Sequence, residues 1–67
     1  SLDAALFNAQ FKLKQKFLSQ SNYLHARRVK MIISKGKVLY KKYDNKNNCE
    51  IIYEISKQGL KGIITGK

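Results

Sequence analysis

The first third of the chain has the apolar spacing of an amphipathic helix. Between residues 2 and 20, apolar residues recur three and four positions apart in two adjacent rows, namely Leu2, Leu6, Leu13 and Phe17, and Phe7, Phe11 and Leu18. Polar residues take the opposite side, among them Asn8, Lys12, Gln15 and Lys16. Ser1 offers a capping hydroxyl, and Asp3 places an acid at the positive end of the helix dipole. The pattern predicts a helix over residues 2–20.

Residues 23–34 fit two kinds of secondary structure. One helical face would contain Ala26, Val29, Ile32 and Ile33. The same segment also alternates at Val29, Met31 and Ile33 as a strand would, and its β-branched residues favour a strand. Gly36, directly after a lysine, is a typical helix end. We therefore expect a second helix over residues 23–34, with a strand as the alternative.

The rest of the chain has the pattern of β-strands joined by polar turns. Residues 38–43 are rich in strand-forming side chains, residues 49–55 alternate between two faces, and residues 60–65 form a third apolar run. Segments 44–48 and 56–59 have the composition of turns. One face of the second strand would contain Cys49, Ile51, Tyr53 and Ile55, which places Tyr53 in the core.

Together these elements predict an α+β fold. Its two N-terminal helices would be followed by a three-stranded antiparallel β-meander, which has one face free to pack against them. The length of 67 residues and the absence of a linker indicate one small basic domain that spans residues 1–67.

The charge of the chain is strongly unbalanced. Fourteen Lys and Arg residues against four Asp and Glu residues give a net charge of +10. Half of these cations lie between residues 23 and 42, a segment without any acid: Arg27, Arg28, Lys30, Lys35, Lys37, Lys41 and Lys42. Such a density requires a polyanion or extensive hydration beside it. Because arginine matches phosphate oxygens in pairs and lysine adds charge, we expect these seven residues to bind nucleic acid.

Lys14 and the tyrosines have two interpretations each. Lys14 falls between the apolar rows of the first helix, where it either extends out over the rim or points into a binding cleft with the other cations. Tyrosines on an exposed sheet face can stack on unpaired bases. Tyr40 and Tyr43 are three residues apart and should lie on opposite faces of their strand, so one of them at most joins such a surface.

The remaining composition limits the chemistry. One cysteine, one histidine and four scattered acids supply no ligand set for zinc, calcium or magnesium, so we expect no metal and no cofactor. No apolar run approaches the roughly 20 residues that a membrane span needs. RNA can still be cleaved without metal by its own 2′-hydroxyl, which requires a base, an acid and cations. His25, the tyrosines and the basic residues include each of these groups, although a single histidine is equally compatible with no catalytic role.

Two segments resemble ribonuclease toxins of the colicin D and RelE types. Residues 34–45 contain a Lys-Gly turn that leads into a tyrosine-bearing strand and an asparagine-rich hairpin, and residues 62–67 form a closing strand that ends in Ile-Thr-Gly. The resemblance implies a metal-independent ribonuclease that acts on tRNA or another structured RNA. The family has a histidine directly after lysines on its first helix, and residues 12–17 contain none. The catalytic group would then be His25, with Tyr40 or Thr65 near the scissile bond.

Three functions therefore compete. The first is a ribonuclease toxin that acts in the cytoplasm and is covered by an acidic inhibitor protein. It would be delivered as a fragment of a larger secreted protein. A chain that starts at Ser1 rather than methionine fits such a fragment, and it fits an artificially trimmed chain equally well. The second is a non-catalytic nucleic-acid-binding module, ribosome-associated or DNA-binding. The third is a membrane-active or partner-docking peptide built on residues 2–20, against which the β-rich second half argues.

Overall fold

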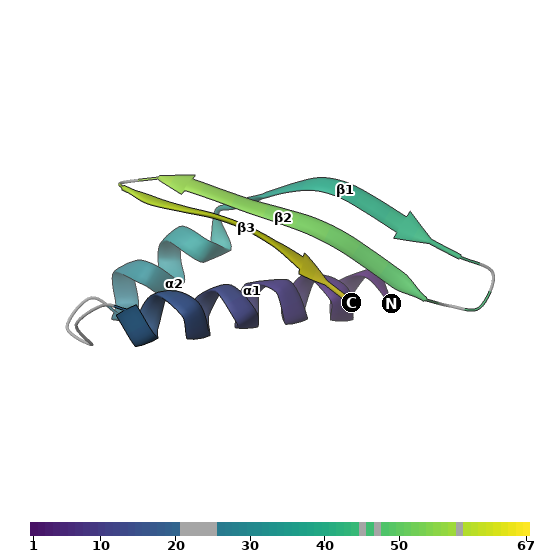
Figure 1. Ribbon diagram of the computed structural model, residues 1–67, viewed down its shortest axis with the longest axis horizontal. Helices are drawn as coiled ribbons and strands as arrows, with labels where there is room; N and C mark the ends of the chain where they lie inside the picture. The colour runs from purple at the N-terminus through teal and green to yellow at the C-terminus, as the bar shows by residue number, and fades with distance from the viewer. Residues whose placement is uncertain (21–25, 45, 47, 58) are drawn as a thin grey trace.

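The computed structural model describes residues 1–20, 26–44, 46, 48–57 and 59–67, which form two layers (Figure 1). Helix α1 (Leu2–Gln20) and helix α2 (Ala26–Ser34) precede strands β1 (Lys37–Tyr43), β2 (Cys49–Lys57) and β3 (Leu60–Gly66). The strands pair antiparallel in the order β1-β2-β3. Both helices lie against one face of the sheet, which we call the covered face, with α2 beside the C-terminal half of α1 (Figure 1). The other face is called the open face. The predicted α+β class, with two helices and a three-stranded antiparallel sheet, is confirmed for the described residues.

The bounds of β1 and β3 each differ from the prediction by one residue, and the larger difference lies in β2. Helix α1 has the predicted bounds, and the helical alternative is confirmed for residues 26–34; residues 23–25 lie outside the described part of the chain. Strand β2 continues through Lys57, which pairs with Leu60, so the prediction of a turn that begins at Ser56 is wrong. Gly59 has φ 86°, a conformation that favours glycine and explains where the chain reverses.

Helix α1 packs on the sheet through two alanines near its start and through a leucine and a phenylalanine farther along. Its buried side chains are Ala5, Ala9, Leu13 and Phe17. Phe7 and Phe11, which belong to the second apolar row of the sequence, are 62% and 46% exposed and stack on each other with ring centroids 6.3 Å apart. At the end of β3, a Cβ atom on Gly66 would overlap the carbonyl oxygen of Ala5 and lie 2.7 Å from the Cβ atom of Ala9. Helix and strand approach so closely at this point that only small side chains fit between them, whereas Leu13 and Phe17 pack near Gly62.

Two polar side chains of α1 form hydrogen bonds with backbone carbonyl groups at the C-terminal end of β3. The Lys12 ammonium donates a hydrogen bond to the carbonyl oxygen of Thr65 at 3.1 Å, and the Asn8 amide donates one to the carbonyl oxygen of Lys67. Both side chains are exposed, as predicted, yet they reach around to a sheet edge that would otherwise present unpaired carbonyl groups. These two hydrogen bonds help to hold α1 along β3.

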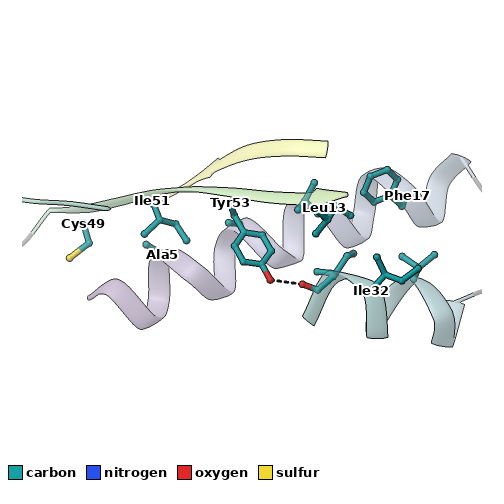
Figure 2. Packing of buried hydrophobic residues seen from close by; sticks show 11 residues of the cluster. Ala5, Leu13, Phe17, Ile32, Cys49, Ile51 and Tyr53 are labelled. Atoms are coloured by element: carbon teal, nitrogen blue, oxygen red, sulfur yellow. Dashed lines mark hydrogen bonds between the residues drawn. The ribbon is translucent and has the colours of Figure 1, made fainter. Parts of the chain in front are cut away.

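Tyr53 joins both helices to the sheet, and Figure 2 shows its bond to α2. Its side chain is 2% exposed, which confirms its predicted place in the core. The hydroxyl donates to the carbonyl oxygen of Ile33 in α2 at 2.5 Å and accepts from the side-chain amide of Gln10 in α1 at 3.2 Å. A Cβ atom on Gly36 would lie 2.6 Å from the tyrosine ring, so the connection from α2 to β1 passes directly over it. One side chain thus positions the end of α2.

The carboxylate of Asp44 holds the turn between β1 and β2. It accepts hydrogen bonds from the backbone N–H groups of Lys46 at 2.8 Å and Asn48 at 2.9 Å, and from the Asn48 side chain at 3.1 Å. The bonds from the Asn48 backbone and side chain, followed by the bond from Lys46, lower the pKa of Asp44 below its ordinary value of 3.8. The charged form of Asp44 is therefore the one that stabilises the hairpin.

Replacing Tyr53 by Phe removes the hydroxyl and keeps the ring. We expect the free energy of unfolding to fall by about 1–2 kcal/mol, because the carbonyl oxygen of Ile33 and the amide of Gln10 lose a partner in the interior. Tyr40→Phe is the matched control: Tyr40 is 47% exposed, and this change should alter stability by less than about 0.5 kcal/mol. Urea unfolding followed by circular dichroism measures both. Equal losses in the two variants would contradict this role of the hydroxyl.

Asp44→Asn should change how stability depends on pH. Because the pKa of Asp44 is lowered by folding, its carboxylate stabilises the protein above pH 3.8, and this contribution is lost as the pH falls through the lowered pKa of the folded state. The variant should unfold at a lower temperature than the wild type near neutral pH, and the difference should shrink in acid. Thermal unfolding over a series of pH values tests this. A difference that stays constant into strong acid would show that the carboxylate charge is irrelevant.

Candidate nucleic-acid interface

Helix α2 turns its apolar residues to the core and its cations to solvent. Its buried residues are Val29, Ile32 and Ile33. Its exposed cations are Arg27, Arg28 and Lys30. Beyond the end of the helix, the N–H groups of Lys35 and Gly36 donate to the carbonyl oxygens of Ile32 at 3.1 Å and Ile33 at 3.3 Å. This last turn keeps Lys35 in line with the cations of α2.

A small pocket lies between α2 and the end of β2. Its volume is about 130 Å³, and it is lined by Arg28, Met31, Ile32, Lys35 and Lys57. Met31, Ile32 and Lys35 follow Arg28 by three, four and seven positions, a spacing that places all four on one side of the helical turn. Lys57 comes from the covered face of β2, two residues beyond the buried Ile55. Three cations from two elements therefore meet beside two apolar side chains.

The acidic residues lie away from this region. We call Arg27, Arg28, Lys30, Lys35 and Lys57 the α2 basic surface. Asp3 lies in the first turn of α1 and Asp44 in the β1–β2 turn. Glu50 and Glu54 alternate with the buried residues of β2 and so lie on the open face. All four acids of the chain are thereby placed outside the α2 basic surface, which gives it a positive potential suited to a polyanion.

Two predicted catalytic residues share a row on the open face. Tyr40 pairs with Ile52, and Ile52 pairs with Thr65 on its other side. Residues directly opposite each other in antiparallel strands project on the same face, so all three side chains do. With about 4.8 Å between neighbouring strands, the Cα atoms of Tyr40 and Thr65 are about 10 Å apart. Two hydroxyl groups thus lie on either side of an isoleucine.

Lysines surround this row, together with the two glutamates. Lys37 is opposite Glu54 and Lys42 is opposite Glu50 in the pairing of β1 with β2. Lys61 is opposite Ser56 in the pairing of β2 with β3. The open face therefore combines three cations with two acids, and its positive charge is weaker than that of the α2 basic surface.

The structure divides the predicted site residues between two layers. Arg27, Arg28, Lys30 and Lys35 come together on the helical side. Lys37, Tyr40, Lys42 and Thr65 come together on the open face. Lys41 pairs with the buried Ile51 and belongs to the covered side of β1. Lys14 is half-buried, one turn beyond Gln10 on α1, and does not line the pocket. His25 lies outside the described residues, so the structure does not place it with either group.

Lys57 and Lys61 are site residues that the sequence analysis did not include. Lys57 was assigned to a turn, and its meeting with Arg28 and Lys35 depends on how the end of β2 packs near α2. Lys61 follows from the antiparallel register once β2 is extended through Lys57. A longer second strand in the prediction would have placed Lys57 on the covered face and Lys61 on the open face, but no local pattern indicates that Lys57 meets Arg28 and Lys35.

Two further observations concern metal ions and membranes. Within the described ranges, no three His, Cys, Asp or Glu side chains gather in a group that could hold a metal ion. In the same part of the chain, neither helix combines the length and the apolar character that a bilayer crossing requires.

Comparison of the chain with known protein families, with curated proteins and with solved structures finds no match. The resemblance of residues 34–45 and 62–67 to colicin D-type and RelE-type toxins thus stays a prediction from the sequence. The function has to be argued from the charges and the geometry of the two faces.

Proposed function

We propose that this protein binds nucleic acid and that the phosphates contact the α2 basic surface. The observation that carries the proposal is the meeting of Arg28, Lys35 and Lys57 at one pocket, with Arg27 and Lys30 exposed on the same helix and every acid of the chain located elsewhere. Contacts between such cations and phosphates release condensed counterions, so binding is strong and depends steeply on salt.

The arrangement of the cations favours the nucleic-acid backbone as the ligand. Arg27 and Lys30 are three residues apart and share one side of α2, whereas Arg28 and Lys35 share the side that lines the pocket. Their guanidinium and ammonium groups can therefore contact phosphates at more than one position of a strand. Phosphate contacts position a nucleic acid and carry no direct base information, so we expect little sequence preference from this surface.

Neutralising the exposed cations of α2 tests the proposal. For the variant Arg27→Gln/Arg28→Gln/Lys30→Gln we expect a weaker complex and a salt-dependence slope smaller by about 1 for each phosphate contact removed. Lys46→Gln, in the exposed β1–β2 turn, is the control for loss of charge alone and should leave the slope nearly unchanged. Fluorescence anisotropy with labelled tRNA and duplex DNA over a salt series measures both. If the loss of affinity for each charge removed is as large in the control as in the α2 variant, the binding surface is not localised on α2 and the proposal is contradicted.

A metal-independent ribonuclease is the second candidate, and the row on the open face favours it. Tyr40 and Thr65 lie on either side of Ile52, and Lys37 and Lys42, each two register positions away, can stabilise negative charge on a phosphorane. In this proposal RNA reaches the open face, and His25 supplies the proton transfer. An acidic inhibitor protein would then associate rapidly with the basic faces through electrostatic steering.

Incubation with total tRNA in EDTA tests the ribonuclease proposal. We expect discrete cuts from the wild type, and their loss in His25→Ala and in Tyr40→Phe, while Tyr43→Phe serves as a control on the covered side of the same strand. Mapping of the new 5′ ends identifies the cuts. The candidate would be contradicted if tRNA stays uncleaved at an equimolar amount of protein, or if the cuts persist in the His25 and Tyr40 variants. Neither result would affect the binding proposal.

A further inference from the structure

We infer that the pocket between α2 and the end of β2 receives a terminal phosphate of a nucleic-acid strand, a phosphate monoester. The inference rests on the proposed function and makes it more specific, because it names the part of the ligand that one site would recognise. Its basis is the meeting of Arg28, Lys35 and Lys57 around a volume of about 130 Å³.

The cations of the pocket come from separate places in the chain. Arg28 and Lys35 are seven residues apart on one side of the helical turn, and Lys57 comes from the covered face of β2. The fold, rather than local sequence, assembles them. The buried contact between Tyr53 and the carbonyl oxygen of Ile33 holds the end of α2 against the strand that carries Lys57. The spacing between the two elements is therefore set in the core.

The rest of the lining strengthens the attraction for an anion. Met31 and Ile32 supply apolar surface beside the three cations, and no carboxylate lines the pocket. Apolar surface limits the access of water, and charge-assisted hydrogen bonds are stronger where water is excluded. Met31 is 54% exposed, so a ligand can reach the pocket from solvent past its side chain.

The size and charge of the pocket favour a strand end over an internal phosphate. An internal phosphodiester carries one negative charge, and the strand must extend out of the site from both of its ester oxygens. A terminal monoester carries a charge of about −1.5 to −2 at pH 7 and offers three oxygens. Those three oxygens match three cations, and only one chain has to leave a pocket of about 130 Å³. The 5′ and 3′ ends share this chemistry, so the experiment has to distinguish them.

The test compares short RNAs that differ only in their ends. Anisotropy titrations of the full chain use one single-stranded RNA with a 5′-phosphate, with a 3′-phosphate, or with hydroxyl groups at both ends. We expect about tenfold tighter binding of one phosphorylated form, the gain of one or more charge-assisted hydrogen bonds. Lys35→Gln and Lys57→Gln should each remove this preference. Lys30→Gln, which replaces an exposed cation of α2 outside the pocket, should weaken binding of all three RNAs but leave the preference for the phosphorylated form unchanged.

The outcomes separate this inference from the proposed function. Equal affinity for the three RNAs, with normal salt dependence, would overturn the terminal-phosphate site and leave nucleic-acid binding in place. Absence of binding to every RNA would overturn both. A preference that survives in Lys35→Gln and Lys57→Gln would place the recognition of the end outside the pocket. Binding of a phosphoserine peptide as tightly as the phosphorylated RNA would also overturn the assignment to a nucleic-acid end.

Because Lys30, Lys35 and Lys57 are exposed, these variants should fold, which circular dichroism checks.

Discussion

The buried hydroxyl of Tyr53 is the contact on which the rest of the arrangement depends. It links the centre of the sheet to the C-terminal end of α2 and, through Gln10, to α1. The chain leaves α2 at Gly36 directly over the tyrosine ring, where any side chain would collide with it. The point at which the chain passes from the helical layer to the sheet is thereby set. Within residues 26–42, the cations before Gly36 therefore lie on the helical side and those after it lie on β1.

This crossing has an electrostatic consequence. In sequence, residues 23–42 are one basic segment, but in the structure its described part, residues 26–42, contributes to two faces of different character. The open face carries Glu50 and Glu54 opposite two of its lysines, whereas the α2 basic surface holds cations alone and gains Lys57 from β2. The helical side is therefore the better candidate for phosphates, and the open face, with Tyr40 and Thr65, is the better candidate for chemistry on RNA.

Much of the fold could be predicted because its signals are local. The helical spacing of residues 2–20 and the alternation from Cys49 to Ile55 depend only on which residues are apolar. The packing of α1 could not be predicted in this way. Phe7 and Phe11 are exposed, whereas Ala5 and Ala9 face the sheet at the point where Gly66 brings the backbones together. That close approach involves two elements from opposite ends of the chain.

The candidate site shows the same limit. The cations of α2 are evident from composition, but the pocket needs Lys57, whose place depends on the packing of β2 near α2. The position of Tyr40 depends on an irregularity: the register shifts between Val38 and Tyr40, so that Tyr40 joins the open face although Val38, two residues earlier, pairs with the buried Tyr53. In an uninterrupted strand the two residues would share a face. Such bulges leave little trace in a single sequence.

The central claim is that nucleic acid contacts the α2 side of the molecule. The most direct measurement is a titration of the ¹⁵N-labelled protein with RNA, followed residue by residue in amide NMR spectra at moderate salt. The account predicts that the largest changes fall on Arg27 to Lys35 and on Lys57, with small changes along β1 and β3. Changes confined to Tyr40, Lys61 and Thr65, with the amides of α2 unaffected, would contradict it and move the interface to the open face.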